Sequence, residues 1–387
     1  MSHRRGKWAT LALVFYTYLV FMYSFQAVPP ILPFLMVEFD VSHVEAGLLM
    51  SVVAFPGILF PLIIGVLVAR FNLRLFGLLA TVLMALGTFT IGWAGSFIQA
   101  LVGRTVLGAS GAIASSIIPV IISRKFSRGE ISKAMGIYNV NVPVAIVLAL
   151  FSVSFLAVAY GWRLPLQLCF ILSLTTIPLF LFIAEEGHLY GGGFPLKALK
   201  NVDMWLVGIL WLLFNSAIVS FITWGPKIYS DAGLTITEAS LTIALVMVSA
   251  APLTPIYGWL LDKFKAYRAM ALLGSATSAL ILAILSAAPA GLLPLITALL
   301  GVTIAMVPPI IFTSPNWILK PHEVGIGFGI ITLCLNIGAA LGPPLIGLIL
   351  DLYKLQGQAL LAIAAIMASS ALIPLLFGKA FTPLIRR

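Results

Sequence analysis

The stretch GIGFGIITLCLNIGAALGPPLIGLIL, residues 325–350, decides the fold class, because it runs from Gly325 to Leu350 without one charged side chain. A helix needs about 20 consecutive apolar residues to cross roughly 30 Å of hydrocarbon. Gly and Pro are tolerated in membrane helices because neighbouring helices satisfy the backbone groups that these residues leave unpaired. The stretch therefore predicts a membrane-spanning helix.

The composition of the whole chain indicates that lipid is its main solvent. Of the 387 residues, 61% are hydrophobic and 9% are charged, whereas soluble domains carry about 25% charged residues. A net charge of +10 would suggest a nucleic-acid partner in a soluble protein. Here the basic residues form short clusters between apolar runs, so we expect them to orient the chain in a membrane and expect no nucleic acid.

Twelve apolar stretches, each about 20 residues or longer, predict twelve membrane spans. The spans are numbered 1 to 12 in this order: 9–36, 46–69, 75–94, 97–122, 135–160, 164–184, 202–225, 239–261, 269–288, 291–313, 325–350 and 358–378. The one longer polar segment, with Gly191, Gly192 and Gly193, lies at the middle of the chain. We expect an all-α integral membrane protein with an N-terminal bundle over 1–184, a linker over 185–201 and a C-terminal bundle over 202–387.

The distribution of Lys and Arg predicts the orientation of the spans. Of the 22 basic residues, 18 fall on the side that holds both termini and the linker, and 3 fall on the other side. The last of them, Arg104, lies within span 4. Cytoplasmic segments are enriched in Lys and Arg, so we expect a multi-pass protein of the cell membrane with both termini and the linker in the cytoplasm.

An internal repeat at an offset of 193 residues divides the chain into two similar halves. Ser42-x-x-Glu45 recurs as Thr235-x-x-Glu238, and both patterns are typical of capping boxes that begin a helix. Further matches pair Gly108 with Gly301, Glu130 with Glu323, and Gly136-Ile137 with Gly329-Ile330. Matched Gly and Glu residues at loop edges indicate two six-span halves in the same orientation.

Three motifs resemble those of the major facilitator superfamily. GWLLDKFKAYR at 258–268 is similar to the family's G-x-L-x-D-[RK]-x-G-[RK]-[RK] signature between spans 8 and 9. Its first-half copy, GVLVARFNLR at 65–74, departs from the signature, with Ala69 at the usual Asp and Asn72 at the usual Gly. In span 4, GRTVLGASGA at 103–112 resembles the family's R-x-x-x-G-x-x-[GA] motif. The resemblance covers essentially the whole chain.

The resemblance implies twelve helices in two pseudo-symmetric bundles around a central cavity, with transport by alternating access. A carboxylate beside a helix start can bind its unpaired N–H groups, so the signature turns are expected to gate the conformational change. The alternative is that their basic residues only anchor the chain to lipid headgroups. The expected gating residues are Gly65, Arg70, Arg74, Gly258, Asp262, Lys263, Arg268, Gly342 and Pro343.

The candidate substrate-binding residues are the polar and aromatic groups within the spans. All twelve acidic residues fall at span ends or in connections, so Arg104 is the charged group placed inside a span. Ionisable groups inside a membrane are costly and are functional candidates by default. For each candidate the alternative is a packing or interfacial role, and for Arg104 a structural tie between spans 1 and 4. The candidates are Arg104, Tyr16, Tyr23, Gln26, Tyr138, Asn139, Asn141, Asn215, Trp224 and Asn336.

These features favour a secondary transporter over the other classes of membrane protein. The sequence has no G-x-x-x-x-G-K-[ST] run, no metal-ligand spacing and no cluster of catalytic groups, so we expect no enzyme activity, cofactor or metal. A basic, carboxylate-free interior favours a small organic or inorganic anion. Export of hydrophobic drugs or lipids is the alternative within transport, although span 5 lacks the second Gly of the drug antiporters' G-x-x-x-G-P motif. A receptor, an enzyme or a channel is the alternative outside it. We expect a monomer, with symport of a coupling ion as one mode.

The predicted topology can be checked with single cysteines at positions 192 and 231. We expect a membrane-impermeant maleimide added to intact cells to label position 231, which is predicted to lie outside, and to leave position 192 unlabelled until the cells are opened. Labelling of position 192 in intact cells would contradict the topology.

Overall fold

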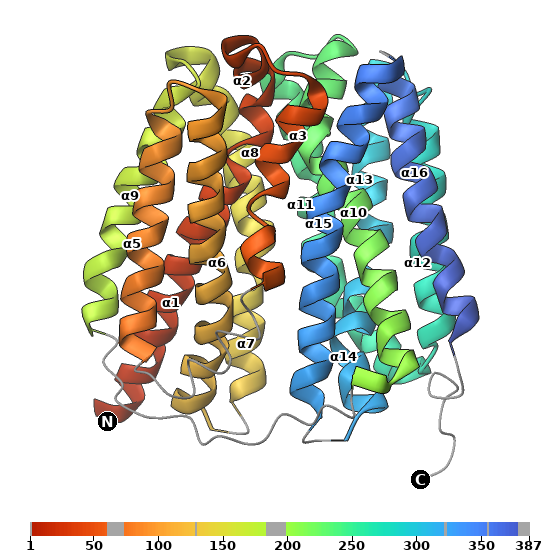
Figure 1. Ribbon diagram of the computed structural model, residues 1–387. Helices are drawn as coiled ribbons and strands as arrows, with labels where there is room; N and C mark the ends of the chain where they lie inside the picture. The colour runs from red at the N-terminus through yellow and green to blue at the C-terminus, as the bar shows by residue number, and fades with distance from the viewer. Residues whose placement is uncertain are drawn as a thin grey trace. The chain divides into compact units, whose positions relative to one another are not determined.

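The computed structural model describes residues 2–59, 73–127, 130–182, 199–320, 323–353 and 356–377, and these residues form helices joined by short turns (Figure 1). In chain order the helices of the first half are α1 (Ser2–Gln26), η1 (Pro29–Ile31), α2 (Leu32–Phe39), α3 (His43–Ser51), α5 (Leu73–Gly92), α6 (Phe97–Lys125), α7 (Ile131–Asn139), α8 (Asn141–Tyr160) and α9 (Arg163–Phe182). Those of the second half are α10 (Val202–Asp231), α11 (Ile236–Phe264), α12 (Tyr267–Leu285), η3 (Ala290–Leu292), α13 (Leu293–Ile304), α14 (Val307–Ile318), α15 (Val324–Tyr353), α16 (Gln356–Leu372) and η4 (Ile373–Leu376).

The predicted all-α membrane fold is confirmed. Within the described ranges, 11 helical segments are long and apolar enough to cross a membrane. The remaining predicted span, 46–69, begins in α3, and its part beyond residue 59 lies outside the described residues. Three other spans are each divided into shorter helices: span 1 into α1, η1 and α2, span 5 into α7 and α8, and span 10 into α13 and α14. α7 and α8 meet at Val140 before Pro143, and α13 and α14 meet before Pro308, because proline removes a backbone donor and clashes with the preceding turn.

The contacts divide the chain into two compact units. The first unit contains Met1–Val41 and Val52–Gly192, and the second contains Ser42–Ser51 and Gly193–Arg387. The contacts of α3 therefore place it with the second half of the chain, although its sequence lies in the first. The predicted linker, 185–201, falls mostly outside the described residues, and the predicted bundle limits stay a prediction.

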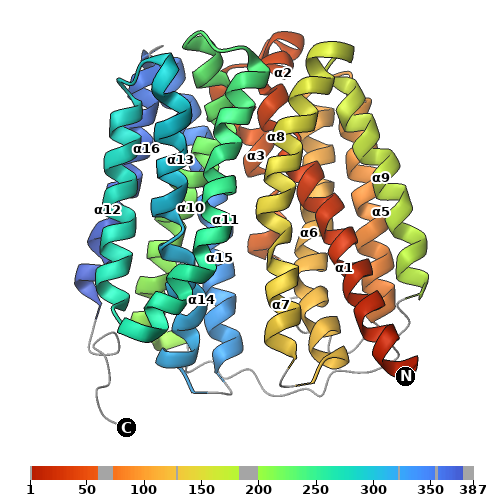
Figure 2. The same cartoon turned by 180° about the vertical axis from the view of Figure 1, so that it is seen from behind.

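The first unit is held together by close packing of α5 with α6 and α9 and of α1 with α8, which Figure 2 shows from behind. Small residues bring α5 and α6 together: a Cβ added at Gly87 would lie 2.7 Å from the backbone nitrogen of Leu107. Small residues are enriched where membrane helices pack, because they let the backbones approach. The buried core of this unit includes Val14, Ile117 and Phe180.

The second unit uses the same device between α10 and α15. A Cβ added at Gly342 of α15 would lie 2.5 Å from the backbone oxygen of Ser216 and 2.6 Å from Ser220 Oγ. Gly338, one turn earlier, lies against the backbone oxygen of Leu212. The Gly338-x-x-x-Gly342 spacing thus places the two helix backbones in direct contact. Further packing joins α12 with α16 and α11 with α13.

An ion pair ties the start of α1 to the turn between α6 and α7 in the first unit. Lys7 Nζ lies 2.6 Å and 2.7 Å from the two carboxylate oxygens of Glu130, and Ser127 Oγ donates to the same carboxylate at 2.9 Å. The Lys7 ammonium also lies 5.6 Å from the ring centroid of Phe126. Hydrogen bonds from Lys7 and then Ser127 lower the pKa of the Glu130 carboxyl.

We expect Glu130→Gln to lower the melting temperature at pH 7 by a few degrees at most, because ion pairs that solvent still reaches contribute little. The Glu130 carboxyl has a lower pKa in the folded chain than its ordinary value. The ionised carboxyl therefore stabilises the folded chain at pH values above that ordinary pKa. The contribution is then lost as the pH falls through the folded pKa. A double-mutant cycle with Lys7→Gln, measured by thermal melting in detergent, should show coupling at pH 7 and less coupling at pH 3.5. Equal coupling at both pH values would contradict the assignment.

Candidate functional site

Arg104 lies in the first third of α6, which begins after Ser96. The Ser96 side chain accepts a hydrogen bond from the backbone N–H of Gln99 and so caps this helix. The Arg104 side chain has no exposed surface. Its Nη1 donates to the backbone oxygens of Phe25 at 3.0 Å and Ser24 at 3.4 Å, and its guanidinium carbon lies 5.2 Å from the Phe25 ring centroid.

The position of these two carbonyls explains how a buried cation is accommodated. α1 ends at Gln26, so Ser24 and Phe25 belong to its last turn. The last four carbonyls of a helix have no partner within the helix and carry the negative end of its dipole. Arg104 thus provides hydrogen bonds and charge to the end of α1. This contact matches the structural role that the sequence left open for Arg104, and a further role toward substrate stays a prediction.

The predicted tyrosines of the first unit contact neighbouring helices. Tyr16 Oη lies 2.7 Å from Thr175 Oγ1 of α9, and Tyr23 Oη lies 2.8 Å from Ser152 Oγ of α8. The ring of Tyr138 is buried and lies 5.0 Å from that of Tyr18, centroid to centroid. Each of these tyrosines therefore has a visible packing or hydrogen-bonding role. The side chain of Asn139, in contrast, is exposed.

Two predicted amides of the first unit are buried with unsatisfied polar atoms. Neither the amide nitrogen nor the amide oxygen of Asn141, at the start of α8, has a hydrogen-bond partner among the described residues. The same holds for Oε1 of Gln26, at the end of α1. A buried polar group without a partner costs about 1–3 kcal/mol, so a polar ligand or a water molecule would be stabilised beside these two side chains.

The candidates of the second unit are bonded within their own helices or to a neighbour. Asn215 and Asn336 each donate through Nδ2 to the carbonyl one turn earlier, of Trp211 and Thr332, at 2.8 Å. Trp224 is fully buried, and its Nε1 donates to the backbone oxygen of Pro343 at 2.8 Å. Trp224 and Pro343, predicted in separate roles, thus belong to one contact between α10 and α15.

The predicted gating residues are only partly visible. Gly65 and Arg70 lie outside the described residues, and Arg74 is half-buried in the first turn of α5. In the second copy of the signature, Gly258 and Asp262 lie on α11, and Asp262 is exposed. Lys263 Nζ lies 4.9 Å from the centroid of one Trp259 ring, and Arg268 Nη2 donates to the backbone oxygen of Leu375 at 2.5 Å. Their gating role remains a prediction.

Lys265, which is not among the residues predicted from the sequence, ends α11 in the left-handed region with φ of 50°. This residue occupies the Gly position of the family signature. A left-handed residue after a helix is usually Gly, because any other side chain meets the backbone there. Aligning the signature residue by residue would have indicated the left-handed turn.

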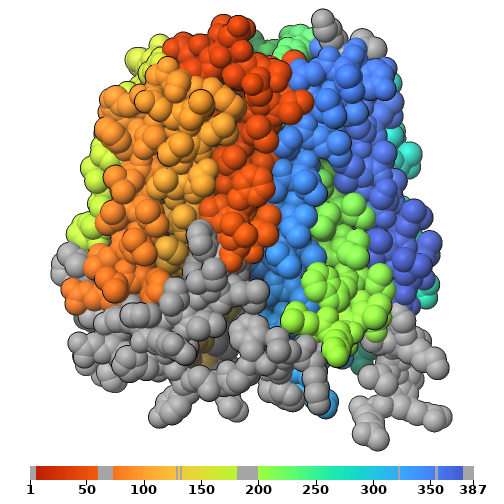
Figure 3. Space-filling model, viewed as in Figure 1, coloured from red at the N-terminus to blue at the C-terminus, as the bar shows by residue number. Residues whose placement is uncertain are grey.

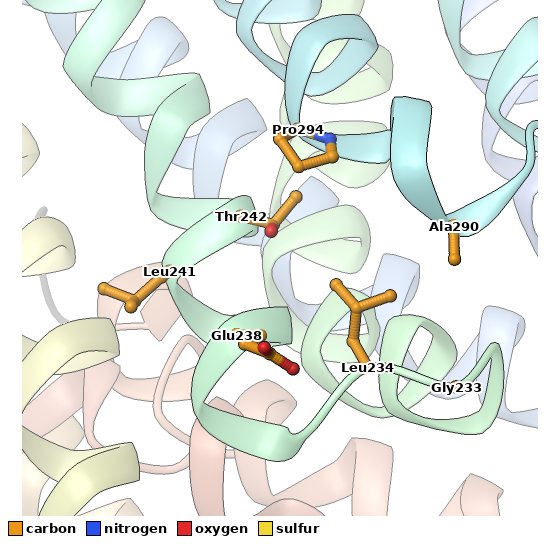
Figure 4. Close-up of a pocket in the computed structure, with 7 residues that line it drawn as sticks. All are labelled: Gly233, Leu234, Glu238, Leu241, Thr242, Ala290 and Pro294. Atoms are coloured by element: carbon orange, nitrogen blue, oxygen red, sulfur yellow. The ribbon is translucent and has the colours of Figure 1, made fainter.

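A depression of about 430 Å³ in the second unit lies beside the start of α11 (Figure 4). Its lining includes Glu238, whose carboxylate accepts from the backbone N–H of Thr235 at 2.9 Å and from Thr235 Oγ1 at 2.8 Å. This is the predicted capping box. Glu238 is the charged residue among the described residues that line the depression, and its carboxylate already bonds to the start of α11.

Comparison with known proteins identifies a matching family and a relative. The model of the Major Facilitator Superfamily matches residues 14–314 and 224–384. The probable nitrate/nitrite antiporter NarK1 of Thermus thermophilus is 28% identical over 250 residues, which is 60% of this chain. The match spans 56% of that relative's own length.

Solved transporter structures share the fold at low identity. A bacterial homologue of the human lysosomal transporter Spinster, inward-facing and unoccupied, gives a TM-score of 0.76 at 16% identity and covers 97% of this chain and 96% of its own. A mutant of the nucleoside transporter NupG gives 0.77 at 13% identity and covers 98% of this chain and 100% of its own. At these identities the likeness shows the fold alone.

The contact between α10 and α15 can be tested by adding one methyl group. We expect Gly342→Ala to destabilise the protein by about 1–3 kcal/mol, because the new Cβ would meet a backbone oxygen that cannot move aside. Gly329→Ala, on the same helix with nothing within 4 Å of its added Cβ, is the matched control and should be neutral or slightly stabilising. Thermal melting in detergent measures both. Equal melting temperatures for the two variants would contradict the packing.

Proposed function

This chain belongs to the major facilitator superfamily, and on that premise we propose that it is a secondary transporter of a small anion, with nitrate and nitrite as the first candidates. Its membership makes it a membrane transporter and not an enzyme. The substrate class is the part that we propose.

The observation that carries the proposal is the fully buried guanidinium of Arg104. A charged side chain inside a membrane span is costly and is a functional candidate by default. A planar guanidinium donates to two oxygens of one planar anion at once, a geometry that an ammonium does not offer. Nitrate, nitrite and small carboxylates all present two such oxygens.

Two further observations support an anion. The chain carries a net charge of +10, and each of its twelve acidic residues falls at a span end or in a connection, so an anion entering the spans meets little repulsion. The relative with 28% identity is named as a nitrate/nitrite antiporter. We therefore propose exchange of one anion for another rather than the symport expected from the sequence, since exchange requires no titratable group within the membrane.

The substrate class can be tested with purified protein in liposomes loaded with nitrite. We expect external nitrate to enter in exchange for nitrite. Arg104→Lys, which keeps the charge but loses the planar fork, should lower the rate at least tenfold, as expected for about 1.4 kcal/mol, and Arg104→Gln should abolish exchange. Arg163→Gln is the control, because this arginine pairs with Glu38 at the surface and should leave exchange unchanged.

The same preparation separates the proposal from its alternative. Wild-type exchange in both Arg104 variants would overturn the role of Arg104. No anion exchange, together with melting temperatures raised by lipophilic drugs or lipids and not by anions, would favour the hydrophobic exporter. A ligand at 100 times its Kd stabilises the folded protein by about 2.7 kcal/mol, which thermal melting detects.

A further inference from the structure

The start of α3 is capped by a side chain that lies 308 residues away in the sequence. Asp351 Oδ1 accepts from the backbone N–H of His43 and Asp351 Oδ2 from that of Val44, both at 3.0 Å. The His43 ring nitrogen Nδ1 lies 2.6 Å from Asp351 Oδ1. Both α3 and Asp351, near the end of α15, belong to the second unit, where the two helices lie side by side (Figures 1 and 3).

These bonds complete the hydrogen bonding of the helix start. The capping box within the segment serves two backbone groups: the Glu45 carboxylate accepts from the Ser42 N–H at 2.8 Å, and Ser42 Oγ accepts from the Glu45 N–H at 3.2 Å. The two N–H groups between them, of His43 and Val44, are those that Asp351 binds. A carboxylate at a helix start gains from these charge-assisted bonds and from the helix dipole.

The packing around the cap holds the two helix backbones at contact distance. A Cβ added at Gly47 would lie 2.8 Å from the backbone oxygen of Pro343, and one added at Gly347 would meet the backbone oxygen of His43. The His43 ring lies 5.5 Å from that of Trp224, whose indole N–H is bonded to Pro343. Asp351 is therefore placed against the start of α3 by the glycines and by Trp224.

The internal repeat does not reproduce this cap. The positions that correspond to His43 and Asp351 at the offset of 193 are Ile236 and Val158, and neither can titrate or accept such bonds through its side chain. The capping box itself is present in both halves. The His–Asp pair is thus a feature added to one copy of a shared helix start.

We propose that His43 and Asp351 form a proton-sensitive clamp that holds α3 to α15 and that tightens when His43 is protonated. Histidine is the side chain whose charge ordinarily changes between about pH 5 and 8, and the two side chains are 25% and 27% exposed, so protons reach them. Nδ1 donates to the carboxylate in the neutral and in the charged ring, but the charged ring adds an ionic attraction.

Among the described residues near this pair, the other charged groups have partners of their own. Asp351 is the charged group of α15 that contacts His43. On α3 itself, the Glu45 carboxylate is bonded to Ser42. On α10, Trp224 faces the ring and is uncharged, while Lys227 and Asp231 bond each other at 2.7 Å. The ionic state of the clamp therefore follows the protonation of His43 while Asp351 stays ionised.

The clamp has a consequence for the conformation of the chain. α3 follows Asp40, a residue in the left-handed region with φ of 49°, and is followed by a turn at 52–54. The segments on either side, ending at Val41 and starting at Val52, belong to the first unit. Any movement that separates α3 from α15 must break the cap, and we infer that such movement becomes harder as the pH falls from 8 to 6.

Hydrogen–deuterium exchange of the full-length protein in nanodiscs tests the clamp without a transported substrate. The readout is the protection of peptides covering 41–51, corrected at each pH for the intrinsic exchange rate. We expect wild-type protection to rise several-fold from pH 8 to pH 6. Asp351→Asn should exchange roughly tenfold faster at pH 6 than the wild type and lose most of the pH dependence.

Two further variants make the result decisive. His43→Gln can donate a hydrogen bond but cannot charge, so it should keep the protection seen in the wild type at pH 8 and show no rise at pH 6. Asp231→Asn removes a carboxylate that bonds Lys227 instead, and should match the wild type at both pH values. Unchanged protection in Asp351→Asn, or a wild-type pH response in His43→Gln, would overturn the proposal. If Asp351→Asn does not fold, His43→Gln decides alone.

Discussion

The absence of water in the bilayer core is the constraint on which the rest of this structure depends. Every backbone N–H and C=O within the hydrocarbon must find a partner in the protein, so the chain forms long helices and each helix end requires its own solution. Inside the spans, Arg104 binds the final carbonyls of α1, and at the partly exposed start of α3, Asp351 binds the first N–H groups. Each of these charged side chains bonds backbone groups that have no partner within their own helix.

The same constraint explains how much could be predicted from the sequence. Apolar runs of about 20 residues follow directly from bilayer thickness, so the spans, the all-α class and the two halves could be predicted. The division of spans 5 and 10 into two helices could have been anticipated from Pro143 and Pro308. The length of an apolar run and the position of a proline can both be read from a short stretch of sequence, so both features could be predicted.

The partners of the candidate residues depend on contacts between distant segments, and the sequence did not reveal them. Arg104 was correctly placed inside a span, but the two carbonyls that it binds depend on where α1 ends. Trp224 was predicted to bind substrate, which stays a prediction, and the sequence did not indicate that its indole is buried and bonds to Pro343. Ser42 and Glu45 indicated where α3 begins, but no local pattern indicates that Asp351 completes its cap.

The assignment of α3 to the second unit has a consequence for biosynthesis. Ribosomes release the chain from the N-terminus, so the N–H groups of His43 and Val44 emerge 308 and 307 residues before the carboxylate that binds them. Until α15 is inserted, the start of span 2 lacks its glycine-lined neighbour. The first six spans therefore cannot complete their packing when they leave the ribosome. Expression of the N-terminal half alone would leave α3 without α15, the helix against which it packs.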